Sequence, residues 1–194
     1  MDSLHAASQT LSPAVRFEAV TFGYGPGPDV LRAVDFEIHA GRMLGLTGHA
    51  GAGRRSCARL LLGEHRARSG MVRLDGADVA DLPPDARVAH ARCDAAAPGE
   101  VLSRALRRDP AVLVVEEPQA YLSAADERAW RDAVDAARRG RTVLLIAHRL
   151  ATLGLCDWIV VLEQGRVAEE GPHDRLVAWN DRYARLIATG VLRR

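Results

Sequence analysis

The feature that most constrains this chain is an apolar run followed by a glycine-rich stretch and then a helical pattern. Residues 43–46 are apolar, which is typical of a short buried strand. Gly48, Gly51 and Gly53 come next and allow a loop that bends tightly. Residues 54–63 then carry apolar side chains at helical spacing. Loop N–H groups and the positive end of a helix dipole both favour phosphate, so this order predicts a phosphate-binding loop.

The loop departs from the phosphate-binding consensus at two positions. The consensus G-x-x-x-x-G-K-[ST] places a lysine on the β- and γ-phosphates and a hydroxyl on Mg²⁺. Here Arg54 takes the lysine position and Arg55 takes the hydroxyl position, while Ser56 offers a hydroxyl one residue later. All 26 basic residues of the chain are arginine, so composition accounts for Arg54. It does not account for the hydroxyl that is missing at Arg55.

Length and composition predict one globular domain. The chain has 194 residues, 48% of them hydrophobic, and we expect a flexible tail over residues 1–14 and a single domain over residues 15–190. A net charge of +1 gives no basis for binding nucleic acid. No segment approaches the ~18–20 apolar residues of a membrane span. We therefore expect a cytoplasmic protein, peripheral at the cytoplasmic face of a membrane if it works there, and in contact with that membrane only through a partner.

Strands alternate with helices along the chain, which predicts an α/β fold. Residues 15–22 and 30–38 are expected to form an antiparallel β hairpin ahead of the parallel part. The wholly apolar runs at residues 111–115 and 142–147 are typical of strands in a parallel sheet that is covered on both faces. Residues 85–99 show no clear period. The other expected elements are a strand over residues 71–74, a strand pair over residues 158–169, and helices over residues 101–108, 123–137, 150–155 and 173–189.

Three segments that are far apart in the sequence are expected to meet at one edge of the sheet. Gly48, Glu116 and His148 each stand at the carboxyl end of a predicted parallel strand. Ligands of α/β proteins bind at those ends. The sequence therefore predicts one site, at which these three segments converge.

Taken in order, these segments resemble the nucleotide-binding domain of ABC transporters, most closely the exporter type. Residues 104–118 look like the helix and strand that end in the family's Walker B motif. Residues 140–150 look like its H-loop segment, and residues 157–186 resemble the carboxyl end of exporters. The resemblance spans residues 15–186 and implies a P-loop NTPase (RecA-like) core. It implies ATP and Mg²⁺ as ligands, and as partners a transmembrane transporter subunit and a second ABC nucleotide-binding domain.

The resemblance also implies roles for individual residues. Tyr24 matches the aromatic residue that stacks on adenine; the alternative is a turn tyrosine that packs on the hairpin. Glu117 matches the residue that polarises the attacking water. His148 matches the γ-phosphate sensor, the alternative being a hydrogen-bonded histidine at a strand end. Glu116 matches a metal-binding aspartate, but its side chain is one methylene longer. The implied nucleotide-binding residues are Tyr24, Gly48, Gly51, Gly53, Arg54, Arg55 and Ser56.

Two further departures concern the middle of the chain. Cys93 stands where the family has the glutamine of the Q-loop, and a thiol is a poor ligand for Mg²⁺. Between Cys93 and Arg104 there is no Leu-Ser-Gly-Gly-Gln signature and no room for the helical subdomain that carries it. The resemblance therefore implies a truncated domain in which that subdomain is largely absent.

These departures lead to two functional hypotheses. The first is an ATP-binding subunit of an ABC-type transporter, for export, with a degenerate site that binds nucleotide weakly and hydrolyses it poorly or not at all. The second is an active ABC ATPase that powers transmembrane export. Because the loop faces the Walker B strand end, we also predict that Arg54 and Arg55 form a charge cluster with Glu116 and Glu117, in the space of Mg²⁺ and the γ-phosphate.

Overall fold

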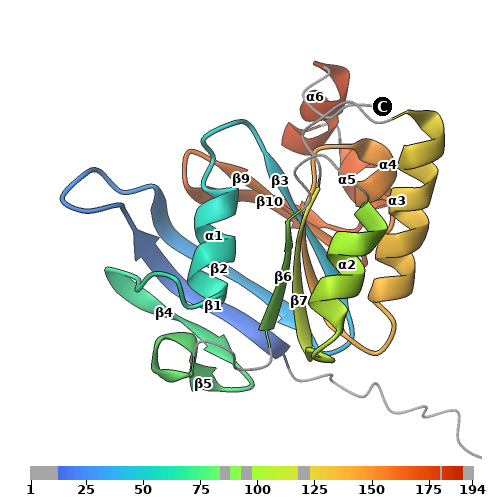
Figure 1. The fold of residues 1–194 in the computed structure, drawn as a ribbon. Helices are drawn as coiled ribbons and strands as arrows, with labels where there is room; N and C mark the ends of the chain where they lie inside the picture. Colours follow the sequence, from blue (N-terminus) through green and yellow to red (C-terminus); the bar gives the residue numbers. More distant parts are fainter. Residues whose placement is uncertain (1–12, 84–87, 93–97, 118–122, 180, 190–194) are drawn as a thin grey trace, which may run out of the picture.

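The structure is a computed structural model that describes residues 13–83, 88–92, 98–117, 123–179 and 181–189. Its strands form two sheets, with helix α1 (Arg54–Leu61) packed between them and the other helices on the far side of the larger sheet (Figure 1). The predicted α/β fold is confirmed. Among the described residues, no helix is both long enough and apolar enough to cross a membrane.

The smaller sheet contains the predicted antiparallel hairpin. Its strand order is β2 (Leu31–His39), β1 (Pro13–Phe22), β4 (Ser69–Leu74) and β5 (Ala77–Asp78), all paired antiparallel. Phe17 lies opposite Phe36 in the register, and the two rings stack with centroids 4.3 Å apart. Because alternate residues of β1 and β2 are apolar, one face of the hairpin packs against α1 and the other stays exposed.

The larger sheet supplies the strand ends on which the site is built. Its strand order is β10 (Arg166–Gly171), β9 (Trp158–Glu163), β3 (Met43–Gly48), β8 (Thr142–Ile146), β7 (Val112–Glu116) and β6 (Val88–Arg92). All neighbours run parallel except β10, which pairs antiparallel with β9. The central strands are buried along their whole length, as their apolar sequences predict.

Two apolar cores lie on the two faces of this sheet. On one face, Val112 and Val114 of β7 join the core that contains α1 and the hairpin. On the other face, Leu113 and Val115 join a core with the remaining helices. Those helices are α2 (Pro98–Leu106), α3 (Ala124–Ala137), α4 (Leu150–Leu153), α5 (His173–Trp179) and α6 (Arg182–Ala188), and a 3₁₀ turn, η1 (Val79–Asp81), follows β5. Successive residues of β7 therefore face different layers of the molecule.

Two elements differ from the sequence-based expectations. Strand β6 forms within residues 85–99, where the sequence shows no apolar period. The period is absent because β6 lies at the edge of the sheet and only Ala91 is fully buried. The single helix expected over residues 173–189 is divided into α5 and α6. The carboxylate of Glu169 on β10 accepts the N–H of Tyr183 at 2.7 Å, so α6 starts with its own cap rather than as a continuation of α5.

The structure also shows how α3 begins and where two of the three cysteines lie. Ser123 caps α3, with its hydroxyl accepting the N–H of Asp126 at 3.2 Å. Cys57 and Cys156 are buried free thiols, and burial raises the pKa of both. Cys93 lies outside the described residues, as does the expected tail apart from the two residues that open β1.

The core beneath α3 gives a first prediction. Trp130 is fully buried, and Trp130→Ala is expected to lower the free energy of unfolding by about 3–5 kcal/mol because it leaves a large cavity. Trp179 is 50% exposed with Arg175 over its ring, so Trp179→Ala is expected to cost less than about 1 kcal/mol. Urea unfolding followed by circular dichroism measures both. Equal midpoints for the two variants would contradict this core.

Candidate functional site

The glycine loop has the backbone that a phosphate cradle requires. Gly48 and Gly53 adopt φ values of 139° and 104°, which side-chain-bearing residues rarely adopt. A Cβ on Gly48 would collide with the carbonyl oxygen of Leu162, and one on Gly53 with the side chain of Leu31. Only glycine fits either position, so the loop can bend from β3 directly into α1.

The first turn of α1 faces this loop without a side-chain cap. Its cap residue is Gly53, which has no side chain to accept a hydrogen bond, and the first turn carries no acidic residue. The opening N–H groups of a helix have no partner within the helix. Together with the dipole, they leave a positive end at the loop that suits an anion.

Glu116 at the end of β7 is held by two nitrogen donors. Its Oε2 accepts a hydrogen bond from Nε of Arg55 at 3.1 Å, and its Oε1 lies 3.1 Å from Nε2 of His90. Burial disfavours the charged form of this carboxyl, but His90 and then Arg55 outweigh burial and hold the pKa of Glu116 below its usual range. The Arg55–Glu116 part of the predicted charge cluster is therefore present.

Glu117 faces the opposite way and is bound on the other side of the sheet. Its side chain has no exposed surface. The N–H groups of His148 and Arg149 donate to its Oε2 at 2.7 and 3.0 Å, and the hydroxyl of Thr152 donates to its Oε1. Nη1 of Arg149 adds an ion pair at 3.3 Å, and Nδ1 of His148 lies 3.2 Å from Oε2. These donors come from the end of β8 and the start of α4.

The alternation of side chains along β7 explains why the carboxylates of Glu116 and Glu117 point to opposite faces of the sheet. Val112 and Val114 face the α1 core, while Leu113 and Val115 face the α3 core. Because successive side chains of a strand point to opposite faces, Glu116 continues the first set and Glu117 the second. The predicted four-residue cluster therefore does not form with Glu117, whose charge is matched by Arg149 instead.

Arg54 lies beside this pair without joining it. In the part of the chain that the structure describes, no hydrogen bond or ion pair of its side chain is found. Burial lowers the pKa of Arg54, and the neighbouring charge of Arg55 lowers it further, while Glu116 and Glu117 act in the opposite direction. Its guanidinium is half-buried next to the loop and keeps all its donors.

Tyr24 and Ser56 are brought together across the start of α1. Their hydroxyl oxygens are 3.1 Å apart, and the tyrosine ring is 43% exposed. The ring also meets Phe22 and His65 edge-on, with centroids 4.9 and 5.4 Å away. The ring thus packs on the hairpin and at the same time stands next to the loop, where the resemblance places adenine.

A family comparison identifies this arrangement. The model of the ABC transporter family matches residues 31–136, which is more than half of the 194-residue chain. The chain belongs to the ABC transporter family. The match includes the glycine loop, both arginines, the strand that carries Glu116, and most of α3.

The curated relatives of this ABC domain are longer proteins. The mitochondrial potassium channel ATP-binding subunit of Xenopus tropicalis is 32% identical and aligns over 89% of this chain but 34% of its own length. The mycobactin import ATP-binding/permease protein IrtA of Mycolicibacterium smegmatis is 30% identical, over 92% of this chain and 28% of its own. The chain thus spans about a third of the length of these relatives.

The fold agrees with that of an ABC exporter. A solved structure of a bacterial Atm1-family ABC exporter with ATP bound superposes with a TM-score of 0.81 at 25% identity, over 97% of this chain and 44% of that one. The present chain is the ATP-binding domain of an exporter-type ABC protein. Its alignment with the Xenopus relative runs over 236 positions, which exceeds the whole chain. The relative therefore has residues without a counterpart here, and only residues 93–97 join β6 to α2, where the helical subdomain was expected to be missing.

The residues of this site fit a phosphate and do not fit Mg²⁺. The glycine loop, the α1 N-terminus and two guanidinium groups all favour an anion. Mg²⁺ requires an octahedron of oxygen ligands. Arg55 offers no oxygen, and both oxygens of Glu116 face nitrogen donors. Among the described residues, no group of three His, Cys, Asp or Glu side chains could hold a metal ion.

Sequence reasoning missed three residues that shape the site. His90 lies on β6, and without a visible strand pattern its register with β7 was not predictable. Arg149 follows His148 directly in the sequence, and Thr152 comes three residues after Arg149. The expected helix over residues 150–155 was a usable signal for both. The residues that open a helix have N–H groups without a partner in the helix, and these can bind a nearby carboxylate such as that of Glu117.

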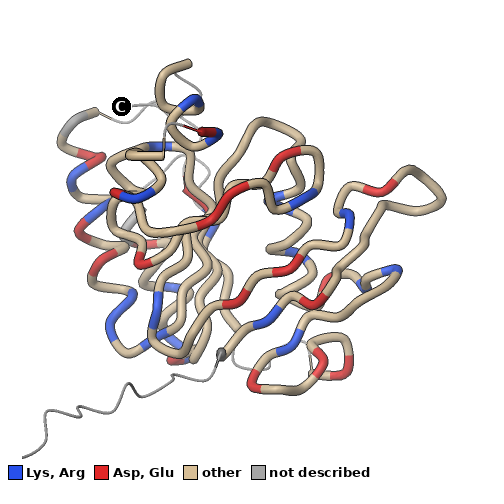
Figure 2. Tube along the Cα trace, turned by 180° about the vertical axis from the view of Figure 1, so that it is seen from behind, with Lys and Arg blue, Asp and Glu red and all other residues tan. Residues whose placement is uncertain are grey.

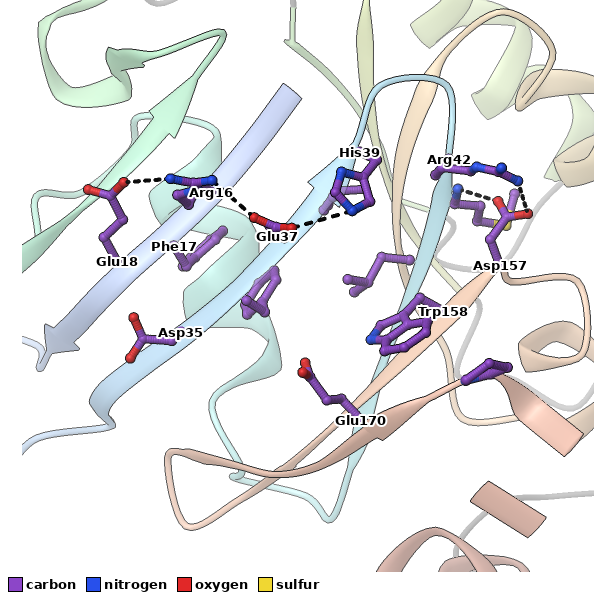
Figure 3. A pocket seen from close by; sticks show the side chains of 15 residues that line it. Arg16, Phe17, Glu18, Asp35, Glu37, His39, Arg42, Asp157, Trp158 and Glu170 are labelled. Carbon is purple, nitrogen blue, oxygen red and sulfur yellow. Dashed lines mark hydrogen bonds and ion pairs between the residues drawn. The ribbon is translucent and has the colours of Figure 1, made fainter. Parts of the chain in front are cut away.

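A groove of about 840 Å³ lies apart from the site, between the hairpin and the strands β3, β9 and β10 (Figure 3). It is lined by ion pairs such as Arg42–Asp157 and by the 40% exposed ring of Trp158. None of the predicted site residues lines it. Acidic and basic residues are interspersed over this side of the trace (Figure 2), which agrees with the near-zero net charge.

The Arg55–Glu116 pair gives a pH-dependent prediction. The folded pKa of Glu116 is depressed, so its contribution to stability is complete above the unfolded value and disappears as the pH falls through the folded one. Arg55→Ala is expected to lower stability at pH 7 by about 1 kcal/mol or less, since the arginine side chain is 49% exposed. The difference is expected to shrink below about pH 4. Thermal melts at several pH values measure it. Arg185→Ala, which removes an exposed arginine of α6, is the control; equal losses at all pH values in both variants would contradict the pair.

Proposed function

We propose that this chain is the ATP-binding subunit of an ABC-type exporter and that its site binds nucleotide weakly and hydrolyses it poorly or not at all. The observation that carries this proposal is the state of Glu117. The residue that matches the family's water-polarising glutamate is fully buried and already bound by its surroundings. A site of this kind responds to nucleotide without turning it over.

The contacts of Glu117 leave it no capacity for a water molecule. A carboxylate offers about four acceptor positions on its two oxygens. Two backbone N–H groups, one hydroxyl, one guanidinium and one imidazole already surround them. A general base must lie within hydrogen-bond reach of the proton that it takes. Glu117 would have to abandon a buried arginine to do so, which is costly.

The substitutions in the loop act in the same direction. Catalysis of phosphoryl transfer consists almost entirely of positioning and electrostatic stabilisation. Arg54 keeps the charge of the consensus lysine but spreads it over a planar group, and Arg55 removes the metal ligand. The signature sequence that would complete a partner's site is also missing from the sequence. Each change removes part of what accelerates hydrolysis.

The relatives support a membrane-bound partner. One of them is named an ATP-binding/permease protein, and this chain aligns with 28% of it. We propose that a transmembrane permease subunit supplies the remainder here, and that a second ABC nucleotide-binding domain pairs with this one. Contact with the membrane would then run through the permease.

An active ATPase that powers export is the second candidate. The observation in its favour is that Glu117 and His148 are both present at strand ends, and that the side chain of His148 is 20% exposed. For hydrolysis, Glu117 would have to exchange its contacts with α4 for a water molecule. The two candidates predict different results for one substitution.

Glu117→Gln separates them. If Glu117 is structural, the variant is expected to leave the already negligible ATP turnover unchanged and to lower the free energy of unfolding by about 3 kcal/mol, because the buried guanidinium of Arg149 loses the carboxylate at 3.3 Å and Glu127 lies farther away, at 4.0 Å. Glu163→Gln, which removes one member of an exposed pair with Arg182, is the control and is expected to unfold at nearly the same urea concentration as the wild type. Phosphate release and urea unfolding are the measurements. Steady magnesium-dependent turnover by the wild type, lost in a Glu117→Gln variant of normal stability, would establish the active ATPase instead.

A further inference from the structure

We infer that the guanidinium group of Arg55 replaces the magnesium ion of this site, so that the ligand is metal-free nucleotide rather than the magnesium complex. This inference rests on the proposed nucleotide-binding function and specifies the form of the nucleotide. It starts from one contact: Nε of Arg55 lies 3.1 Å from Oε2 of Glu116, the carboxylate that matches the family's metal-binding aspartate.

The position of Arg55 leaves no place for a cation. The consensus uses the residue at this position to bind Mg²⁺ through a hydroxyl, and Arg55 has only donors there. Its positive charge is set against the carboxylate of Glu116, which would otherwise attract the metal. The second oxygen of Glu116 faces His90 at 3.1 Å. A divalent cation would have to displace both nitrogen donors and then lie beside a guanidinium of like charge.

The same two arginines provide donors for phosphate. A guanidinium has five N–H donors, and Arg55 uses one of them on Glu116. Within the described residues, its terminal amino groups make no further hydrogen bond, and the side chain is 49% exposed at the mouth of the loop. Arg54 next to it uses none. Planar guanidinium groups bind phosphate oxygens in pairs, so the two side chains can hold the oxygens that Mg²⁺ would otherwise bridge.

A comparison of charges predicts which form of ATP the two arginines prefer. The consensus site offers the phosphates three positive charges, one from lysine and two from Mg²⁺. Arg54 and Arg55 offer two, and metal-free ATP carries more negative charge than its magnesium complex. The arginines therefore prefer the metal-free form, and the interaction is expected to weaken as ionic strength rises.

The ring of Tyr24 distinguishes a nucleotide from a simple polyphosphate. It is 43% exposed next to the start of α1, and its hydroxyl lies 3.1 Å from that of Ser56. An exposed aromatic ring beside a phosphate cradle offers a stacking surface to a base. Inorganic tripolyphosphate, which has the charge but no base, is therefore expected to bind more weakly than ATP.

The test is calorimetric titration of the purified chain with ATP, in EDTA and in excess Mg²⁺. We expect binding in EDTA, weakened at least about threefold by Mg²⁺ because the bound metal neutralises part of the phosphate charge that attracts the arginines. Arg55→Ser restores the consensus hydroxyl. It is expected to lose about tenfold in affinity in EDTA and to bind more tightly with Mg²⁺ than without. Arg139→Ser removes the same charge from an exposed arginine that precedes β8, at the opposite end of the parallel strands from the loop, and is expected to behave like the wild type.

The possible results separate this inference from the proposed function. Binding that needs Mg²⁺, without hydrolysis, overturns the inference and leaves the proposed function standing. Steady hydrolysis overturns the proposed function, and absence of binding in both conditions overturns both. If tripolyphosphate binds as tightly as ATP, the site recognises polyphosphate, and the inference that its ligand is a nucleotide is wrong. A melt of each variant checks its fold, and if Arg55→Ser does not fold, the wild-type comparison between EDTA and Mg²⁺ still decides.

Discussion

The alternation of side chains along β7 is the constraint on which the site depends. The strand is buried on both faces, so each of its residues belongs either to the α1 core or to the α3 core. Glu116 and Glu117 continue that alternation past the point where apolar contacts end. Adjacent carboxylates are thereby assigned to different layers and different partners. One meets the arginine of the phosphate loop, and the other meets the arginine that opens α4.

How far the sequence predicted this structure depends on the kind of signal available. Long apolar runs located β3, β7 and β8, and the glycine loop located the start of α1, because burial on both faces and tight turns leave strong patterns. Strand β6 left none, since an edge strand of five residues needs little apolar surface. The contact of His90 with Glu116 depends on the register of that strand and was therefore hidden with it. The division of α5 from α6 depends on a cap that Glu169 provides from another element.

The predicted charge cluster shows the same limit within the site. The topology of the fold brings the glycine loop close to the end of β7. The pairing of Arg55 with Glu116 could be predicted from that proximity. The pairing of Glu117 required knowing which face each residue of β7 serves. A strand always alternates its side chains between two faces, but a wholly apolar run such as residues 111–115 does not show which face each residue takes until the layers on the two sides are known. Once Glu117 is placed on the α3 side, its pairing with Arg149 can be understood: the N–H groups at the start of α4 and the buried guanidinium of Arg149 together stabilise the carboxylate.

A guanidinium in the place of a metal changes what the site can do. Mg²⁺ is exchanged with each nucleotide and brings its charge to the phosphates, whereas Arg55 is part of the chain and its charge is shared with Glu116. An arginine can neutralise phosphate oxygens, but it cannot exchange ligands around the transferred group as a metal ion does. Such a substitution preserves recognition of charge more than it preserves catalysis. It therefore agrees with the buried state of Glu117: on both faces of β7, the carboxylates that match the family's metal-binding and water-polarising positions are bound to arginines of the same chain.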